Sequence, residues 1–205
     1  MTAYWRTWVE AAALAGVALA APALLTAQAT DLPPAGFGSL KQDQAAVMIT
    51  TGNLAVRVLP LDERIIRLLA PDTYASLHAI VQSKASAIAA AARDAARDSV
   101  EIFYVTFYAL QPQVTFVPDQ VSIQSLGSYY RPLAILPLSP LWNDARLDQG
   151  RQASAIYLFD PSIPVSQTFT VYYGDQYSAT FDNALTLLQS ERARVLARAA
   201  QKSQP

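Results

Sequence analysis

The sequence predicts a mainly β fold with helices (α+β), in which an antiparallel β-sandwich is joined to a helical appendage and a C-terminal helix. Short runs rich in β-branched and aromatic residues, separated by Pro, Gly and Asp, occupy residues 99–178, and this spacing is typical of a sandwich or barrel. Apolar residues recur at helical spacing over 71–98 and 180–200. A continuous apolar run within residues 1–29 predicts an N-terminal signal or anchor helix.

Residues 1–29 have the three parts of a secretory signal peptide. Arg6 supplies the basic start, residues 11–25 form the apolar core, and Ala27-Gln28-Ala29 is a small-x-small cleavage site. Because Arg6 keeps the N-terminus in the cytoplasm, we expect the rest of the chain on the periplasmic side of a bacterial inner membrane.

The same segment also fits an uncleaved membrane anchor. Residues 8–27 are long enough to span the hydrocarbon of a bilayer. Tyr4, Trp5 and Trp8 are amphipathic aromatic residues of the kind that lie at a membrane interface. The sequence leaves both alternatives open, so the membrane is a partner through residues 8–27 only if the leader is retained.

Residues 30–98 are expected to form a linker and a helical appendage. Residues 30–43 are rich in Pro and Gly, which predicts an extended linker. The segment 44–98 begins with two apolar runs around Gly52-Asn53, a turn sequence typical of a hairpin. A short helix is expected from Asp62, and Pro71 suits the first turn of a longer, alanine-rich helix that continues to about residue 98.

The sandwich is expected within 99–178, because the apolar period changes to two at Ser99. The predicted strands cover 100–108, 114–117, 120–124, 131–138, 154–159 and 167–173. The segment 179–205 then forms a C-terminal helix and tail, with basic residues at its end in agreement with the helix dipole. The inward stripe of this helix is predicted to be Phe181, Leu185, Leu188, Val195 and Leu196.

Four stretches of the β half resemble the immunoglobulin-like domains of bacterial extracytoplasmic proteins. They are Phe116-x-Pro-Asp-x-Val-x-Ile, Tyr130-Arg-Pro-Leu-Ala-Ile, Ala155-Ile-Tyr-Leu-Phe-Asp and Phe169-Thr-Val-Tyr-Tyr-Gly. The resemblance covers about residues 99–177 and implies an immunoglobulin-like sandwich, although the Cys-Trp-Cys pattern of true immunoglobulin domains is absent. Such domains mostly bind or brace other proteins, but a fold alone does not assign a function.

The inventory of reactive side chains predicts that the chain is not an enzyme and holds no cofactor. It has one histidine, His78, and no cysteine, which excludes disulfides and the usual zinc, haem and copper sites. We expect His78 to be a helix histidine with one hydrogen bond. The net charge of −1 argues against nucleic acid as a partner, and glycine-rich phosphate loops and a Gly-x-Ser-x-Gly elbow are absent from the sequence.

A pair of carboxylates could in principle hydrolyse glycosides. Asp119 and Asp160 lie next to prolines and are expected to form turns. The remaining candidates are Glu101, Asp144 and Asp148. A carboxylate-dependent hydrolase would need two of these side chains at one pocket.

Two stretches carry residue types that are common in protein interfaces. Tyr129, Tyr130 and Arg131 lie beside a predicted turn, and tyrosine and arginine are frequent among interface hot spots. The alternative is a strand whose tyrosines alternate between the core and solvent. Residues 137–151 form a loop too long for a hairpin turn, and Trp142 within it either anchors a partner or covers the core of its own domain.

These observations predict a non-enzymatic, extracytoplasmic structural or accessory protein, tethered to the membrane, that braces a larger membrane or envelope assembly through its sandwich and aromatic loops. A multi-subunit energy-transducing complex, respiratory or photosynthetic, is one candidate host. The alternative from another class is a free periplasmic module that binds a small molecule or a peptide in a concave pocket. The third alternative is the carboxylate-dependent hydrolase.

Overall fold

The computed structural model describes residues 32–202. The predicted signal or anchor, with Tyr4, Trp5 and Trp8, lies outside the described residues. Between residues 32 and 202 the chain is a mixed α+β fold with mostly antiparallel sheets and a C-terminal helix, which confirms the predicted fold class at that level. In this range no helix is both long and apolar enough to cross a membrane.

The larger sheet has five antiparallel strands in the order β1-β2-β3-β9-β7. They are β1 (Val47–Thr50), β2 (Leu54–Pro60), β3 (Glu101–Ala109), β9 (Gln152–Phe159) and β7 (Ala134–Pro137). β1 and β2 form the hairpin predicted around Gly52-Asn53, and β2 pairs along its whole length with β3, where Val56 lies opposite Phe107. The segment 44–98 therefore contributes two strands to the sheet that contains β3 and β9.

The smaller sheet has four antiparallel strands in the order β11-β10-β5-β6. They are β5 (Val121–Ser125), β6 (Ser128–Tyr130), β10 (Thr170–Tyr173) and β11 (Gln176–Ser178). The sequence did not predict β11, and it offered a strand at β6 only as the alternative interpretation of Tyr129 and Tyr130; each of these strands has three residues. The remaining short elements are the ribbon of β4 (Val114–Thr115) and β8 (Arg146–Leu147), and the 3-10 helices η2 (Gln42–Gln44), η3 (Pro118–Gln120) and η4 (Pro140–Trp142).

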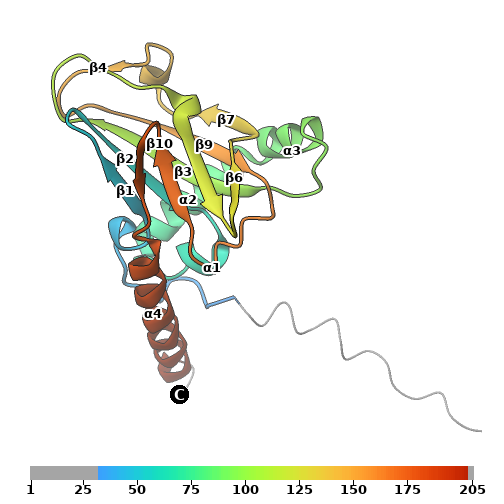
Figure 1. The fold of residues 1–205 in the computed structure, drawn as a ribbon. Helices are drawn as coiled ribbons and strands as arrows, with labels where there is room; N and C mark the ends of the chain where they lie inside the picture. Colours follow the sequence, from blue (N-terminus) through green and yellow to red (C-terminus); the bar gives the residue numbers. More distant parts are fainter. Residues whose placement is uncertain (1–31, 203–205) are drawn as a thin grey trace, which may run out of the picture. The chain divides into compact units, whose positions relative to one another are not determined.

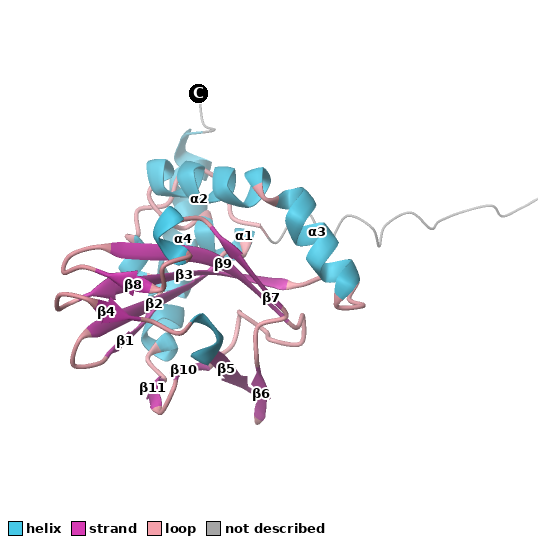
Figure 2. Cartoon of the chain, turned by 90° about the horizontal axis from the view of Figure 1, so that it is seen from above, coloured by secondary structure: helices cyan, strands magenta, loops and turns pink. Residues whose placement is uncertain are grey.

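The two sheets face each other across an aromatic core (Figure 2). Phe103 and Phe107 on β3 lie 5.7 Å, between ring centroids, from Phe169 and Tyr173 respectively. β1 lies next to β10 and β11, so the two sheets meet along that side. Aromatic rings remove more apolar surface from water than other side chains, so this contact makes a large hydrophobic contribution to the fold.

Three helices cover the other face of the larger sheet (Figure 2). They are α1 (Glu63–Ile66), α2 (Pro71–Ser83) and α3 (Ala85–Asp94). Asp62 caps α1, since its carboxylate accepts a backbone N–H of the first turn at 2.7 Å. Pro71 is the first residue of α2, which confirms the predicted start of this helix.

The helix expected from residue 71 to about 98 is divided in the structure. Lys84, between α2 and α3, has φ −107° and ψ 4°, which is not a helical conformation. The sequence carries no Pro or Gly at this point, so the break depends on tertiary packing. Leu77 and Ile88, one on each helix, are both buried in the core, and α2 and α3 run in different directions over the sheet (Figure 2).

Helix α4 (Phe181–Lys202) extends away from the sheets (Figure 1). Its first turn is fixed by Phe181, whose ring centroid lies 4.0 Å from that of Phe169. The predicted stripe is buried at Leu188 and Val195, but Leu196 is 50% exposed. Between Leu188 and Val195 of this stripe, the charged side chain of Glu191 is fully buried.

Residues 33–40 of the predicted linker are packed against the rest of the fold. Leu40 donates its N–H to Leu68 at 3.2 Å, and its carbonyl accepts the N–H of Ala70 at 2.9 Å. Gly38 lies so close to residues 68–69 that a Cβ atom on it would be 2.3 Å from their backbone. This part of the chain is therefore a fixed element of the body.

We expect Gly38→Ala to destabilise the fold, because the new Cβ atom would overlap the backbone of Leu68 and Leu69. Urea unfolding should show a loss of about 2 kcal/mol or more in the free energy of unfolding. Gly52→Ala is the matched control: nothing lies within 4 Å of a Cβ atom there, so its effect should stay within about 0.5 kcal/mol. Equal stability of the two variants would contradict the tight packing of residues 33–40.

Candidate functional site

The outer face of the smaller sheet carries a row of three tyrosines, Tyr129, Tyr172 and Tyr177, which we call the tyrosine face. Residues of β5 alternate in burial, with Ile123 in the core and Gln124 on the outside. Residues directly opposite each other share a face of the sheet, so Tyr129, the partner of Gln124, points outward. Tyr172 on β10 is the partner of Tyr177 on β11, which extends the row to a third strand.

The ring of Tyr172 contacts the rings of both other tyrosines, and its hydroxyl is hydrogen-bonded to Tyr129. Ring centroids are 5.4 Å apart for Tyr129 and Tyr172, and 5.6 Å apart for Tyr172 and Tyr177. The Tyr129 hydroxyl donates to that of Tyr172 at 3.3 Å, which in turn donates to Gln124 Oε1 at 2.8 Å. The bond with Tyr129 is the main reason why the pKa of Tyr172 is raised. Tyr129 and Tyr177 still expose 63% and 67% of their surface, so the row is ordered and open to solvent.

The neighbours of Tyr129 in the predicted site lie at different depths. Tyr130 pairs with Ile123 and packs half-buried against the core, which is the alternation expected for a strand. Arg131 is exposed and lines a shallow depression of about 380 Å³ together with Ser122. Because Ser122 lies opposite Tyr172, this depression places Arg131 beside the tyrosine face.

The turn between β5 and β6 contains a residue that does not suit its backbone. Leu126 and Gly127 have φ values of 49° and 80°, the left-handed pair of a type I′ turn, in which Asn-Gly or Asp-Gly is usual. A leucine in this conformation costs about 1 kcal/mol. Its side chain is 70% exposed, so packing in the core does not account for it either. Such departures from local preference gather at functional sites.

Trp142, in the long loop of residues 137–151, is 8% exposed. Its ring centroid lies 5.3 Å from that of Phe116 and 5.7 Å from that of Phe107. This position fits the second of the two interpretations of Trp142, a cover over the core of its own domain.

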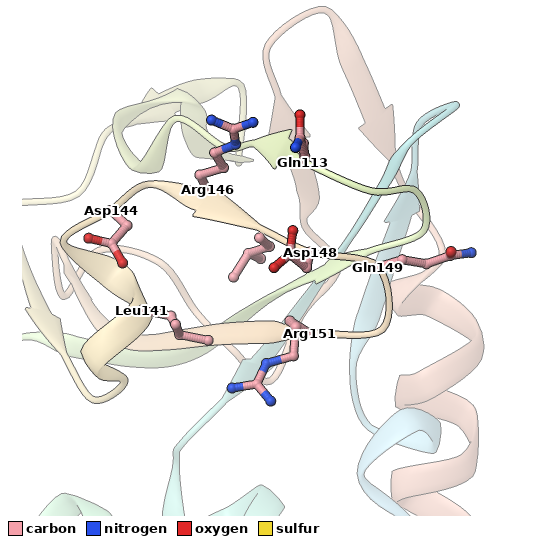
Figure 3. Close-up of a pocket in the computed structure, with 8 residues that line it drawn as sticks. Gln113, Leu141, Asp144, Arg146, Asp148, Gln149 and Arg151 are labelled. Carbon is pink, nitrogen blue, oxygen red and sulfur yellow. The ribbon is translucent and has the colours of Figure 1, made fainter.

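The same loop surrounds a surface hollow of about 680 Å³ (Figure 3). Its charged lining residues, two acidic and two basic, are Asp144, Arg146, Asp148 and Arg151. Gln113 and Ala145, next to β4 and β8, have φ values of 57° and 48°, so backbone strain is also present here. Figure 3 shows the guanidinium groups of Arg146 and Arg151 turned away from each other, and the carboxylates of Asp144 and Asp148 facing different directions. The charged groups therefore do not converge on one point.

The other carboxylates that the sequence offered for hydrolysis lie away from this hollow. Asp160 accepts the N–H of Ser162 at 2.9 Å and pairs with Arg97 at 2.8 Å, as expected of a turn former. The hydrogen bonds from Ser162, and then the charge of Arg97, lower the pKa of Asp160. Asp119 lies in the short helix η3, also in a turn.

His78 has a carboxylate partner, as expected for a helix histidine with one hydrogen bond. Its Nδ1 lies 2.7 Å from Oε1 of Glu63. Glu63 also accepts from Arg67 Nε at 2.5 Å and from the Tyr74 hydroxyl at 3.3 Å. Burial raises the pKa of Glu63, but the hydrogen bonds with Arg67 and His78 outweigh burial and the pKa is lowered. These contacts join α1 to α2.

Within residues 32–202, no three His, Asp or Glu side chains gather in a way that would hold a metal ion. Comparison of the chain with protein-family models, curated proteins and solved structures gives no match. The function must therefore be argued from the geometry of this chain.

The sequence identified one member of the tyrosine face and missed two. Tyr172 and Tyr177 lie on either side of the two-residue turn Gly174-Asp175, which brings them opposite each other. Treating this turn as the centre of a hairpin would have found the pair, because two-residue loops fix the strand register. The pairing of β10 with β5, which brings Tyr129 to the same row, is long-range and leaves no local signal.

Glu101, the first residue of β3, predicts a pH dependence of stability. Burial raises its pKa to about 7, with a contribution from the charge of Asp62 that is opposed by Arg64. The unfolded chain has the ordinary value of 4.5, so the folded state binds the extra proton between pH 4.5 and about 7. Stability should therefore fall as pH rises through this window.

Urea unfolding at several pH values tests this expectation. Glu101→Gln should remove most of the fall. At pH 8 it should be more stable than wild type by about 1–2 kcal/mol, because solvent screens part of the cost of a charge at this partly exposed position. Asp148→Asn, at an exposed carboxylate, is the control and should follow the wild-type profile. A Glu101→Gln profile parallel to wild type would show that Glu101 is ionised normally in the fold.

Proposed function

We propose that the chain is a non-enzymatic, extracytoplasmic structural protein that binds a partner protein through the tyrosine face and braces a larger membrane-associated assembly. The observation that carries this proposal is the row of Tyr129, Tyr172 and Tyr177, which is joined by ring contacts and by the hydrogen bond between Tyr129 and Tyr172, while Tyr129 and Tyr177 remain exposed to solvent. Tyrosine is frequent at interface hot spots, because it offers a large contact area at a low cost in side-chain entropy.

Neighbouring groups extend this surface. Arg131 is exposed at the depression beside the tyrosine face, and Leu126 projects from the tip of the β5–β6 turn. Aromatic residues and arginine are enriched in the centre of protein interfaces. A sheet face presents its side chains over a broad surface, which suits a protein partner, whereas small ligands prefer concave pockets.

The immunoglobulin-like character of residues 99–178 belongs to this proposal. Two facing antiparallel sheets with an aromatic core support it. The larger sheet also includes β1 and β2 from the segment 44–98, which an ordinary immunoglobulin domain does not have. The proposed architecture is therefore an enlarged sandwich.

The location and the tether rest on the sequence of residues 1–29, with its basic start and apolar core. In this proposal the leader is retained over residues 8–27 and holds the body at the periplasmic side of the inner membrane. The host is then an envelope complex, of which a respiratory or photosynthetic energy-transducing complex is one example.

A second candidate is a free periplasmic module that binds a peptide or another zwitterionic molecule in the hollow of Figure 3. The specific observation that favours it is the coincidence of two acidic and two basic side chains with strained backbone at Gln113 and Ala145. Strain of this kind persists where surrounding structure enforces it, and it clusters at binding sites.

Extraction of native membranes in mild detergent, followed by size-exclusion chromatography, tests the proposal. We expect wild type in an assembly larger than the monomer, and the triple variant Tyr129→Ser/Tyr172→Ser/Tyr177→Ser as a monomer. The variant should still fold, because exposed cross-strand pairs contribute only about 0.2–1 kcal/mol each.

The matched control is Arg146→Ser/Asp148→Ser in the hollow, which should stay in the assembly. A wild-type protein that behaves as a lone soluble monomer contradicts the proposal, and so does a tyrosine variant that remains assembled. Release by the hollow variant alone would also contradict the proposal, because it would place the assembly interface at the hollow and not at the tyrosine face.

Leu126→Asn separates folding from binding at the same surface. Asparagine tolerates the left-handed conformation, so the free energy of unfolding should rise by about 1 kcal/mol. Assembly should nevertheless weaken, because the exposed apolar side chain is lost. Ala96→Gly relieves a comparable φ of 52° just after α3, a helix that covers the larger sheet, whereas Leu126 lies beside the smaller sheet. This variant should be more stable than wild type and assemble normally. Unchanged assembly in Leu126→Asn would remove Leu126 from the proposed interface.

A further inference from the structure

The tether of the proposed function has little free length, because residues 33–40 are fixed to the body at three points. Arg67 Nη1 donates to the carbonyl of Pro33 at 3.4 Å. The N–H and Oγ of Ser39 both donate to Oε1 of Glu191 on α4, at 2.9 and 2.8 Å. Leu40 completes the attachment through its backbone bonds to the segment after α1. Pro33 is already buried, so the fixed part begins there.

This attachment limits how far the body can lie from a membrane. An anchor that ends at residue 27 leaves six residues up to Pro33, which span at most about 20 Å when fully extended. This step rests on the tether of the proposed function. The body is then held next to the lipid surface, and the part of it closest to Pro33 and Phe37 faces that surface.

The basic end of α4 lies at this part of the body. Lys202 Nζ is 5.5 Å from the ring centroid of Phe37. Residues 192–202 contain four basic residues and no acidic one, namely Arg192, Arg194, Arg198 and Lys202. The Arg194 side chain is 70% exposed.

One acidic residue of α4 lies close to these cations and compensates part of their charge. Glu191 is fully buried; it pairs with Arg198 and lies 3.7 Å from Arg194. Burial raises the pKa of Glu191, but the hydrogen bonds of Ser39 and Arg198 outweigh burial and the pKa is lowered, so Glu191 is ionised at neutral pH. Without Arg192, the other three basic residues and Glu191 carry a net charge of about +2.

We propose that the basic end of α4 binds the anionic phospholipid headgroups of the membrane that holds the anchor. The positive charge of the helix end is complementary to the negative charge of the headgroups, and the docked segment 33–40 holds the helix end close to the membrane. Each basic side chain near an anionic leaflet contributes about five-fold to binding. The interaction should weaken with salt, since surface charges are screened.

The absence of cysteine permits a direct test with the full chain in lipid nanodiscs. A fluorophore on Gln201→Cys reports the end of α4. A second one is placed on Asn143→Cys, at the end of η4, which contacts β8. The ribbon of β4 and β8 lies at the opposite end of the body from the free end of α4 (Figure 1). Discs of phosphatidylcholine alone are compared with discs that also contain phosphatidylglycerol, and both carry a headgroup quencher. We expect stronger quenching at residue 201 with phosphatidylglycerol, reversed by salt, and no change at residue 143.

Charge reversal provides the matched variants. Arg194→Glu/Lys202→Glu should abolish the lipid-dependent quenching at residue 201, whereas Arg146→Glu/Arg151→Glu at the hollow should leave it unchanged. A chain that stays in both discs but shows equal quenching in them overturns this inference alone. A chain that is lost from both discs overturns the tether and this inference with it.

Discussion

The burial of strand β9 on both faces is the constraint on which the rest of the structure depends. Residues 153–159 are all buried, and since side chains of a strand alternate between its two faces, both faces of the larger sheet must be covered. The smaller sheet covers one face and α1–α3 cover the other (Figure 2). The buried polar side chains of Thr106 and Ser154 in the larger sheet bind each other, since the Ser154 hydroxyl donates to that of Thr106 at 3.2 Å. The outer face of the smaller sheet is left to solvent, and it is where the exposed tyrosines lie.

The second organising interaction is the buried carboxylate of Glu191. A charge without exposed surface costs desolvation energy, and here the N–H and hydroxyl of Ser39 and the guanidinium of Arg198 offset that cost. An apolar residue of similar size would fill the same space with comparable stability. What the carboxylate adds is a specific contact, because both donors of Ser39 bind the same oxygen and tie this position of the N-terminal segment to α4. This is the physical reason why a Pro/Gly-rich stretch behaves as part of the body.

Local signals in the sequence account for much of the fold and for little of the site. Gly52-Asn53, Asp62 and Pro71 act within a few residues of themselves, so the β1–β2 hairpin and the starts of α1 and α2 could be predicted. The break at Lys84 and the docking of residues 33–40 depend on partners far along the chain, which composition does not encode. The tyrosine face could be predicted in part. Tyr129 was identified from its residue type, whereas its contact with Tyr172 arises only when β10 pairs with β5. Tyr130, identified by the same argument, faces the core because neighbouring residues of a strand point in opposite directions.

A fixed N-terminal segment and an ordered tyrosine row together favour bracing over capture. A module that captures a mobile ligand gains from a long, flexible linker, because such a linker lets it search a large volume. A short linker raises the effective concentration of the binding face only for partners that are held at the same distance from the membrane. In Figure 1 the outer face of the smaller sheet looks toward the viewer, and the free end of α4 points down and away. If that end rests on lipid headgroups, the tyrosine face looks along the membrane plane, toward the extramembrane part of a neighbouring protein. The lipid contact and the protein contact would then use different sides of the body, and each would restrict the orientation available to the other.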